Sequence, residues 1–414
     1  MKFKKLISVL SSCVLLSGCG AVQESPDIQT NNLTSSVQSQ PVSVSETGTD
    51  FQSSQLQFAV NLFQQTVSEH ADENVLVSPL SVMLALSMTA NGANGETLSE
   101  MEQVLGNQIS DLNQNLYSYT NSLPSGEKAK FSLANSIWCR NEEGFTVNPD
   151  FIQTDANYYQ ADVYQEDFSP ETCDKINQWV SQKTNGMIDS IIDTIDSNTM
   201  MYLINALSFD AEWLHIYEDT DIREGQTFTS ADGIQQTVTM MHSSENIYLE
   251  SEQATGFIKP YADGYSFIAL LPDEKISVDD YITSLTPDFL SDMLANAQDA
   301  EVIANMPKFK NEFETSLVDT LTAMGMPTAF SSMADFSGMS DINLHIGDVL
   351  HKTFIEVDER GTKAGAVTAV QMDEEGIMET EPKFVTLDRP FVYMIVDNQN
   401  NLPLFIGTVK EIQE

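Results

Sequence analysis

The stretch from residue 356 to residue 370 constrains this chain more than any other feature. It begins as a strand and continues as a run of small and β-branched residues, Gly361-Thr-Lys-Ala-Gly-Ala-Val-Thr368. An acidic, polar segment follows, and ordered pattern resumes only at Arg389-Pro-Phe391. Long segments without structure are uncommon inside compact domains and are usually functional or disordered. Residues this small, with this β-propensity, can slide between two strands. The segment is therefore predicted to be a loop that doubles as a spare strand.

The apolar patterning of the rest of the chain predicts an α+β domain. Helical spacing covers 58–67, 79–88, 96–105 and 316–324. Strand patterns cover 202–209, 237–241, 267–271 and 300–306, and a terminal hairpin joins 391–396 to 404–409.

Short motifs spread over roughly residues 50–414 carry a family resemblance. In order, they are Asn74-Val-Leu-Val-Ser-Pro-Leu-Ser-Val82, Ala85-Leu-Ser-Met88, Asn91-Gly-Ala-Asn-Gly-Glu-Thr97, Leu133-Ala-Asn-Ser-Ile-Trp138, Ile176-Asn-Gln-Trp-Val180, Leu203-Ile-Asn-Ala206, Trp213, Met306-Pro-Lys-Phe309, Asp335-Phe-Ser-Gly-Met339, His351-Lys352 and Arg389-Pro-Phe391. Each is weak alone, but their order and spacing together are specific. The chain resembles the serpins, and residues 356–370 resemble the hinge of the serpin reactive loop.

The resemblance implies a single serpin domain over residues 51–414. Its fold would have three β-sheets, about eight or nine helices and an exposed reactive-centre loop at about 360–389. The hinge would comprise Glu359, Gly361, Thr362, Lys363, Ala364, Gly365, Ala366, Val367 and Thr368. A polar network controlling sheet opening would comprise Ser78, Ser81, Asn205 and His351, and a cluster at the top of the sheet Trp213, Lys308 and Glu359. From the residues alone, Ser78 and Ser81 flank Pro79 at the head of an apolar helix, where serine is a good cap.

The resemblance also implies a mechanism, in which the chain is an inhibitor and not an enzyme. The cleaved loop would enter the central sheet and trap a target serine protease, or a cysteine protease, as a covalent 1:1 acyl-enzyme. No cofactor is expected. The hinge departs from the inhibitory pattern at Arg360, where an acid is common, and at Gly365, which replaces alanine. A non-inhibitory serpin acting as a binding or scaffold protein is the alternative. A hydrolase is disfavoured, because neither Gly-x-Ser-x-Gly nor His-Glu-x-x-His occurs.

The scissile bond is predicted within a six-residue window, and two ways of counting place it differently. Counting forward from the hinge places the cut after about Glu375, and counting back from Pro390 places it after about Glu379. The window is Glu374, Glu375, Gly376, Ile377, Met378 and Glu379. No Lys or Arg lies between Lys363 and Lys383, so elastase-like, chymotrypsin-like or subtilisin-like targets fit better than trypsin-like ones. A glutamate-specific protease is the rival.

The N-terminus reads as a targeting segment. Three lysines precede an apolar run at 6–16 that is too short to span a bilayer as a mature helix. Leu16-Ser-Gly-Cys19 resembles a bacterial lipobox, which implies a signal peptide at 1–18, lipidation of Cys19, and a flexible Ser/Gln/Thr-rich tether at 19–50. The expected location is the bacterial cell surface, or the extracellular medium. An ordinary cleaved signal is the alternative. The anchor alone would suggest a solute-binding lipoprotein, which the motif order contradicts.

Charge and cysteine usage limit the partners. The net charge of −42 argues against binding to nucleic acid or anionic lipid surfaces, so membrane contact is expected only through the lipid, and the protein is expected to be a monomer. Removing residues 1–18 removes three lysines and no acids, which changes −42 to −45. Cys139 and Cys173 would remain. They are expected to be free buried thiols, although a pair stays open, and their spacing fits no zinc site.

Overall fold

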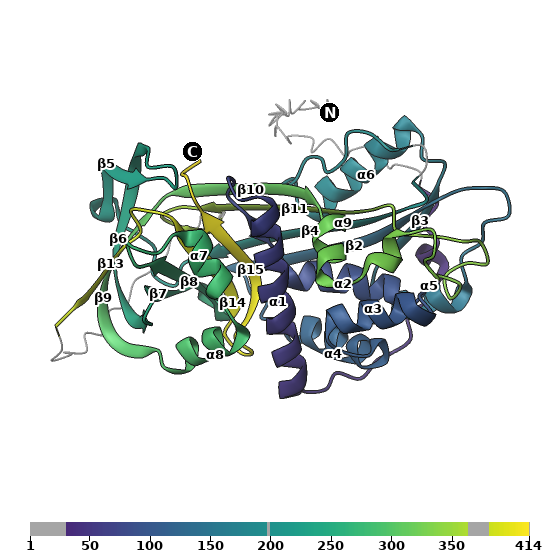
Figure 1. Cartoon of the computed structure of the whole chain (residues 1–414), viewed down its shortest axis with the longest axis horizontal. Helices are drawn as coiled ribbons and strands as arrows, with labels where there is room; N and C mark the ends of the chain where they lie inside the picture. Colours follow the sequence, from purple (N-terminus) through teal and green to yellow (C-terminus); the bar gives the residue numbers. More distant parts are fainter. Residues whose placement is uncertain (1–29, 197–198, 363–380, 414) are drawn as a thin grey trace, which may run out of the picture.

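The computed structural model describes residues 30–196, 199–362 and 381–413. Within these residues the chain forms nine α-helices that surround two mixed sheets (Figure 1). The helices are α1 (Thr49–Glu69), α2 (Pro79–Ala90), α3 (Gly95–Leu105), α4 (Ile109–Ser122), α5 (Pro149–Tyr158), α6 (Pro170–Lys183), α7 (Val278–Ser284), α8 (Pro287–Ala295) and α9 (Val318–Met324). The described residues also include four short 3-10 helices, η1 (Thr34–Ser36), η2 (Asp219–Asp221), η3 (Ala262–Gly264) and η4 (Pro327–Phe330).

The central sheet has six strands. Its order is β10 (Phe309–Ser316), β11 (Asp348–Val357), β12 (Gly361–Thr362), β4 (Met201–Glu212), β2 (Ala129–Arg140) and β3 (Asp162–Glu166). The second sheet follows the order β1 (Leu76–Val77), β15 (Leu402–Val409), β14 (Phe391–Asp397), β8 (Tyr265–Pro272), β7 (Ala254–Pro260), β6 (Gln235–Glu250), β9 (Gln298–Pro307) and β13 (Lys383–Thr386), and β5 (Ile222–Thr229) pairs with β6.

The central sheet is covered on both faces, as the near-continuous apolar run of β4 requires. On β4, Tyr202 and Ile204 join a cluster beneath α6, whereas Leu203 and Leu207 face the main core on the side of α2. Alternate residues of a strand point to opposite faces, so α6 and α2 lie on opposite sides of the sheet. In Figure 1, α6 lies above the sheet and α2–α5 lie below it.

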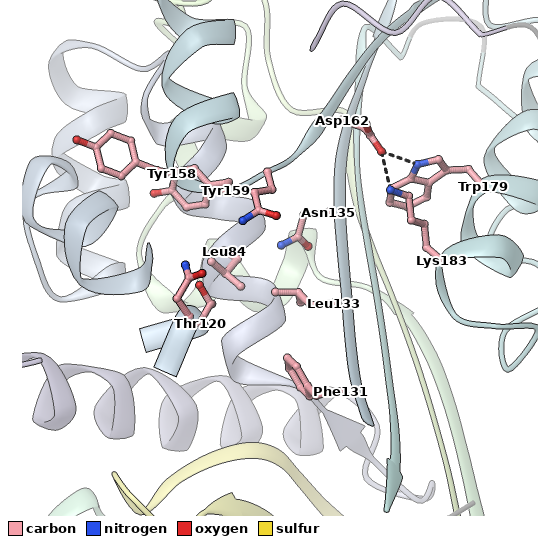
Figure 2. A pocket seen from close by; sticks show the side chains of 12 residues that line it. Leu84, Thr120, Phe131, Leu133, Asn135, Tyr158, Tyr159, Asp162, Trp179 and Lys183 are labelled. Atoms are coloured by element: carbon pink, nitrogen blue, oxygen red, sulfur yellow. Dashed lines mark hydrogen bonds and ion pairs between the residues drawn. The ribbon is translucent and has the colours of Figure 1, made fainter. Parts of the chain in front are cut away.

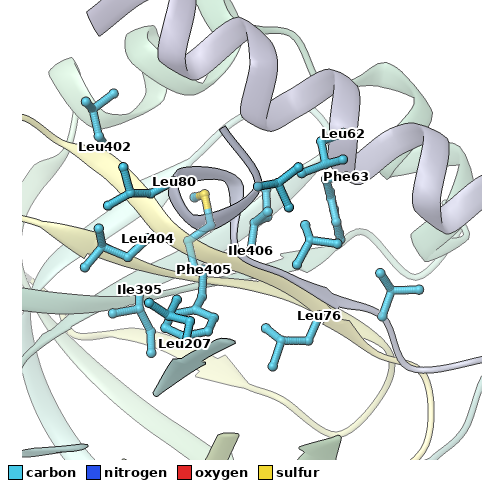
Figure 3. Packing of buried hydrophobic residues seen from close by; sticks show 14 of the residues in the cluster. Leu62, Phe63, Leu76, Leu80, Leu207, Ile395, Leu402, Leu404, Phe405 and Ile406 are labelled. Atoms are coloured by element: carbon cyan, nitrogen blue, oxygen red, sulfur yellow. The ribbon is translucent and has the colours of Figure 1, made fainter. Parts of the chain in front are cut away.

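The main core joins the two sheets through α1 and α2. Figure 3 shows Leu62 and Phe63 of α1 on the side of Ile406 of β15, and Leu80 of α2 on the side of Leu404 of the same strand. Every residue of α2 is buried, because this helix is apolar nearly all round. Full burial of one Leu, Val or Met side chain stabilises the folded state by about 1.5–3 kcal/mol. The many buried side chains of α2 therefore hold this helix firmly beneath the strands that it supports.

The sequence predicts most of this architecture correctly. Each predicted helix and strand is present, the number of helices agrees, and the terminal hairpin is β14–β15. The resemblance implies three sheets, whereas the described strands form two hydrogen-bonded sheets, because the sixteen-residue strand β6 pairs with β9 and also with β7. None of the described helices is long and apolar enough to cross a bilayer.

Two boundaries differ from prediction. The predicted loop at 360–389 includes ordered structure, since β13 pairs with β9 in parallel from Lys383 to Thr386. The predicted tether at 19–50 is also wrong over part of its length. Leu33 donates a backbone hydrogen bond to Val163 of β3, and the Asn32 amide donates to Asp162. This segment therefore covers the edge of the central sheet before α1 begins.

The buried carboxyl group of Asp155 in α5 allows a test of how this helix packs against the rest of the domain. The carboxyl group is fully buried, and neither oxygen accepts a hydrogen bond within the described residues. Burial raises the pKa of Asp155 well above its usual range. Above about pH 4 the unfolded chain loses the proton first, so stability falls as the pH rises toward the folded-state pKa. Asp155→Asn should therefore raise the unfolding free energy by on the order of 1–3 kcal/mol at pH 7.

Denaturant unfolding between pH 4 and pH 7 measures this gain, which should grow as the pH rises. Asp150→Asn is the control, because Asp150 lies on the same helix but is exposed. An Asp155→Asn gain that stays constant across this pH range would contradict the assignment.

Candidate functional site

The central feature of the site is the boundary between β4 and β11, here called the opening line. These two strands pair in parallel only from Asp348 to Thr353, opposite Tyr202 to Leu207. Their outer neighbours are held over longer stretches, because β4 pairs with β2 over eleven residues and β10 pairs with β11 over eight. The opening line is therefore the shortest ladder among these strands of the central sheet.

Above this ladder, β12 occupies the space between the two strands. Thr362 pairs with Val357 of β11 and with Ala211 of β4, antiparallel to both. Its side chain is fully buried, and its hydroxyl lies 2.5 Å from that of Tyr261. At Gly361 a Cβ atom would lie 1.9 Å from the carbonyl oxygen of Ala211, so only glycine fits against this backbone.

The predicted sheet-opening network lies across the ladder. Asn205 is directly opposite His351 on one side and directly opposite Asn135 on the other. The His351 ring lies 3.1 Å from the Asn205 carbonyl oxygen, and the Asn205 amide donates to Asn135 and to the backbone of Ser81. Three neighbouring strands thus contribute one row of polar side chains, buried above α2.

The hydrogen bonds determine the protonation state of His351. The backbone N–H of Ser78 donates to Nε2 at 3.2 Å, so this nitrogen carries no proton and Nδ1 is the donor to Asn205. Burial lowers the pKa of His351 to about 3, which agrees with a neutral ring. Ser78 also caps α2 by accepting from the Ser81 N–H. The Ser81 hydroxyl has no partner within the described residues, so Ser81 joins the network through its backbone.

Sequence reasoning missed two members of this site. Asn135 lies in a motif that carried the resemblance, but only the strand register places it opposite Asn205. Tyr261 follows a strand and carried no signal of its own. Both belong to the site through contacts between distant parts of the chain, which periodicity does not reveal.

The predicted cluster at the top of the sheet is also brought together. Lys308 forms an ion pair with Glu359. Desolvation is the largest single effect on the pKa of Glu359 and acts to raise it. The hydrogen bond from Lys308, a backbone hydrogen bond and the charges of Lys308 and Arg360 together outweigh desolvation, so this pKa is lowered. The Trp213 indole donates to the Asp358 carbonyl at 2.8 Å and stacks on Tyr261, with ring centroids 4.2 Å apart. Trp213 therefore lies directly beside the turn that leads into β12.

A pocket of about 420 Å³ opens beside the row of polar side chains. Figure 2 shows Phe131, Leu133 and Asn135 of β2 facing it, with Leu84 of α2 nearby. Its single carboxylate, Asp162, is occupied by Lys183 at 3.1 Å and by the Trp179 indole at 3.0 Å. No histidine or cysteine lines this part of the described chain, so the pocket offers no nucleophile paired with a base.

Cys139 and Cys173 are buried and unpaired. Burial raises the pKa of Cys139 to about 12, which makes the thiol unreactive. Other predicted residues lie outside the described residues: the hinge from Lys363 to Thr368, the scissile window 374–379, and Cys19.

Comparison with known proteins agrees with this geometry. The family model "Serpin (serine protease inhibitor)" matches residues 53–412. The native state of tengpin, a thermophilic serpin, has a TM-score of 0.88 and 48% identity, covering 93% of this chain and 100% of that one. An uncharacterized serpin-like protein from Thermococcus kodakarensis is 32% identical, covering 84% of this chain and 83% of its own length. Intracellular coagulation inhibitor 2 from Tachypleus tridentatus is 30% identical, over 86% and 90% of the two chains.

The two mixed sheets, the row of polar side chains and β12 between β4 and β11 agree with the serpin class of protein. The chain belongs to the serpin family, which the family model describes as serine protease inhibitors.

The neutral state of His351 has a measurable consequence. In the unfolded chain histidine takes up a proton near pH 6.5, whereas the folded protein resists protonation down to about pH 3. Stability should therefore fall as the pH drops below about 6.5, and the loss should grow until about pH 3. His351→Gln should reduce the difference in melting temperature between pH 7 and pH 5, although it lowers both values. His345→Gln, at a partly exposed site, is the control. An unchanged pH difference in His351→Gln would refute the assignment.

Proposed function

We propose that this serpin is inhibitory and traps a target serine protease as a covalent 1:1 acyl-enzyme by inserting its cleaved reactive loop along the opening line. The observation that carries the proposal is β12, in which Gly361 and Thr362 pair with β4 and Thr362 also pairs with β11. Strand addition needs a first pair from which to propagate, and β12 supplies it. Serpin loop insertion is itself a known example of strand addition that releases stored strain.

The register of β12 supports continued insertion. Thr362 pairs with Val357 and Ala211, so a strand continuing antiparallel would bring residue 368 opposite His351 and Asn205 (357 − 6 and 211 − 6). Residues 362, 364, 366 and 368 would face the same side of the sheet, and they are Thr, Ala, Ala and Thr. Small side chains suit this covered face, and a threonine hydroxyl suits the row of polar side chains. Lys363 would face the opposite side.

The target class and the location follow from the sequence. Ile377 and Met378 in the scissile window fit an apolar specificity pocket, and no Lys or Arg occurs from residue 364 to residue 382. The target is therefore an elastase-like, chymotrypsin-like or subtilisin-like protease, with a glutamate-specific protease as the rival. The lipobox supports a bacterial lipoprotein held at the cell surface by Cys19 or released into the medium.

Incubation with proteases of known specificity tests the function. An elastase-like protease should give a complex of serpin plus protease that survives a denaturing gel, and trypsin should not. Mass spectrometry of the released fragment should place the cut between Glu374 and Glu379. A non-inhibitory serpin would be cleaved, or left intact, without a complex. Full inhibition after cleavage at Lys363 or Lys383 would contradict the assigned window.

Thr362→Arg tests insertion itself. The arginine would have to enter a fully buried position without a charged partner, which is strongly unfavourable. The loop should still be cut, but the acyl-enzyme should hydrolyse, so the serpin consumed per trapped protease should rise by about tenfold or more. Lys363→Arg is the matched control, because it places the same side chain one residue further on, toward the opposite face.

Melting curves complete this test. Cleaved wild type should melt far above the intact protein, and cleaved Thr362→Arg should gain much less. Loop insertion is excluded if Thr362→Arg inhibits as well as wild type, or if cleavage leaves the wild-type melting temperature unchanged.

The acidic surface should act on the association rate. With a net charge near −45 after signal removal, encounter with a basic protease should be electrostatically steered. The association rate constant should fall by about tenfold or more between 0.05 M and 0.5 M salt. An acidic protease of the same specificity is the control and should show no such fall. A flat salt dependence with the basic protease would leave the charge as a solubility feature only.

A further inference from the structure

A buried lysine lies behind the cluster at the top of the sheet. The Lys259 side chain is 3% exposed, and its ammonium lies 2.8 Å from a carboxylate oxygen of Glu245, which is 6% exposed. The ammonium also lies 5.3 Å from the centre of the Trp213 ring and 4.3 Å from that of Tyr217. It donates to the His215 carbonyl at 3.3 Å. Lys259, Glu245, Trp213 and Tyr217 are here called the lysine cage.

The short segment from Trp213 to Tyr217 connects this cage to the reactive loop. The Trp213 N–H donates to the Arg360 carbonyl, the Tyr217 N–H donates to the Glu359 carbonyl, and the Trp213 indole donates to the Asp358 carbonyl. Three consecutive carbonyls of the turn before β12 are thus held by two residues, whose rings both face the Lys259 ammonium. A charge this deeply buried is tolerated only with partners, and such a site is sensitive to the loss of any one of them.

We infer that Lys259 and Glu245 are positioning residues for the hinge. The cation orders the segment 213–217 through two aromatic rings and one carbonyl, and that segment holds residues 358–360 where β12 can pair with β4 and β11. Tyr261 extends the same contact, because its ring stacks on Trp213 and its hydroxyl meets that of Thr362. The effect on protease trapping rests on the proposed inhibitory function, whereas the ordering of segment 213–217 does not.

The test compares Lys259→Met with a matched control, Lys410→Met. Lys410 is also 3% exposed, and its ammonium pairs with Asp279 at 2.6 Å and with the Ala71 carbonyl. Among the described residues, no hydrogen bond or ion pair joins Lys410, Asp279 or Ala71 to residues 358–362. Both variants should lower the melting temperature. Hydrogen–deuterium exchange of peptide 213–218 in the intact protein should accelerate by about tenfold or more in Lys259→Met only. Glu245→Gln should act in the same direction, and Lys259→Arg should restore slow exchange in part.

The second readout is the number of serpin molecules consumed per trapped protease, measured well below both melting temperatures. This number should rise severalfold in Lys259→Met and stay unchanged in Lys410→Met. Equal exchange of peptide 213–218 in the two variants would overturn the positioning role, whatever happens to inhibition. If wild type traps no protease, the inhibitory function fails, and the exchange result still decides the role of Lys259. If Lys259→Met does not fold, Glu245→Gln provides both readouts.

Discussion

The structure depends on the short parallel ladder between β4 and β11. Six residues on each strand pair there, whereas the neighbouring ladders are longer and antiparallel. On the other side of the opening line, β11 is tied to β10 by cross-strand ion pairs of Lys310 with Glu356 and of Lys352 with Glu312 and Glu314. Each pair has at least one solvent-exposed partner and contributes little alone, but all three join β11 to β10 and none of them joins it to β4. The proposed insertion therefore requires the sheet to divide only at this boundary, while its two parts stay paired.

The row of polar side chains divides along the same boundary. Parting β4 from β11 breaks the bond between His351 and Asn205. It leaves Asn205 bonded to Asn135 and to the Ser81 carbonyl, and His351 bonded to the Ser78 N–H. Both fragments remain neutral, because His351 carries a single ring proton. A charged side chain in this row would lose its partner when β4 and β11 part, and an unpaired charge in a buried site is costly. Uncharged amides and a neutral imidazole avoid that cost.

The sequence predicts the elements well and their contacts less well. Periodicity reveals α1, α2 and the strands of the terminal hairpin because each buries a regular apolar face. It misses β13, because a strand of four residues with Phe384 exposed and Val385 buried is too short to show a periodic apolar pattern. It also misreads residues 31–37, which attach to β3 through backbone and asparagine hydrogen bonds with little apolar content. Both segments are ordered by pairing with distant strands, β9 and β3, and this pairing leaves no pattern in the local sequence.

The same distinction between predicted and unpredicted features applies to the residues of the site. Ser78, Ser81, Asn205 and His351 could be named from motifs, but Asn135, Tyr261 and Lys259 belong to the site only through register and packing. These three share a physical role, since each supports a group that the motifs do identify: Asn205, Thr362 and Trp213. A motif records residues whose chemistry is specific, whereas many kinds of neighbour can support them. Lys259 lies in none of the motifs, so this buried lysine behind the hinge is recognised only from its packing against Trp213 and Tyr217.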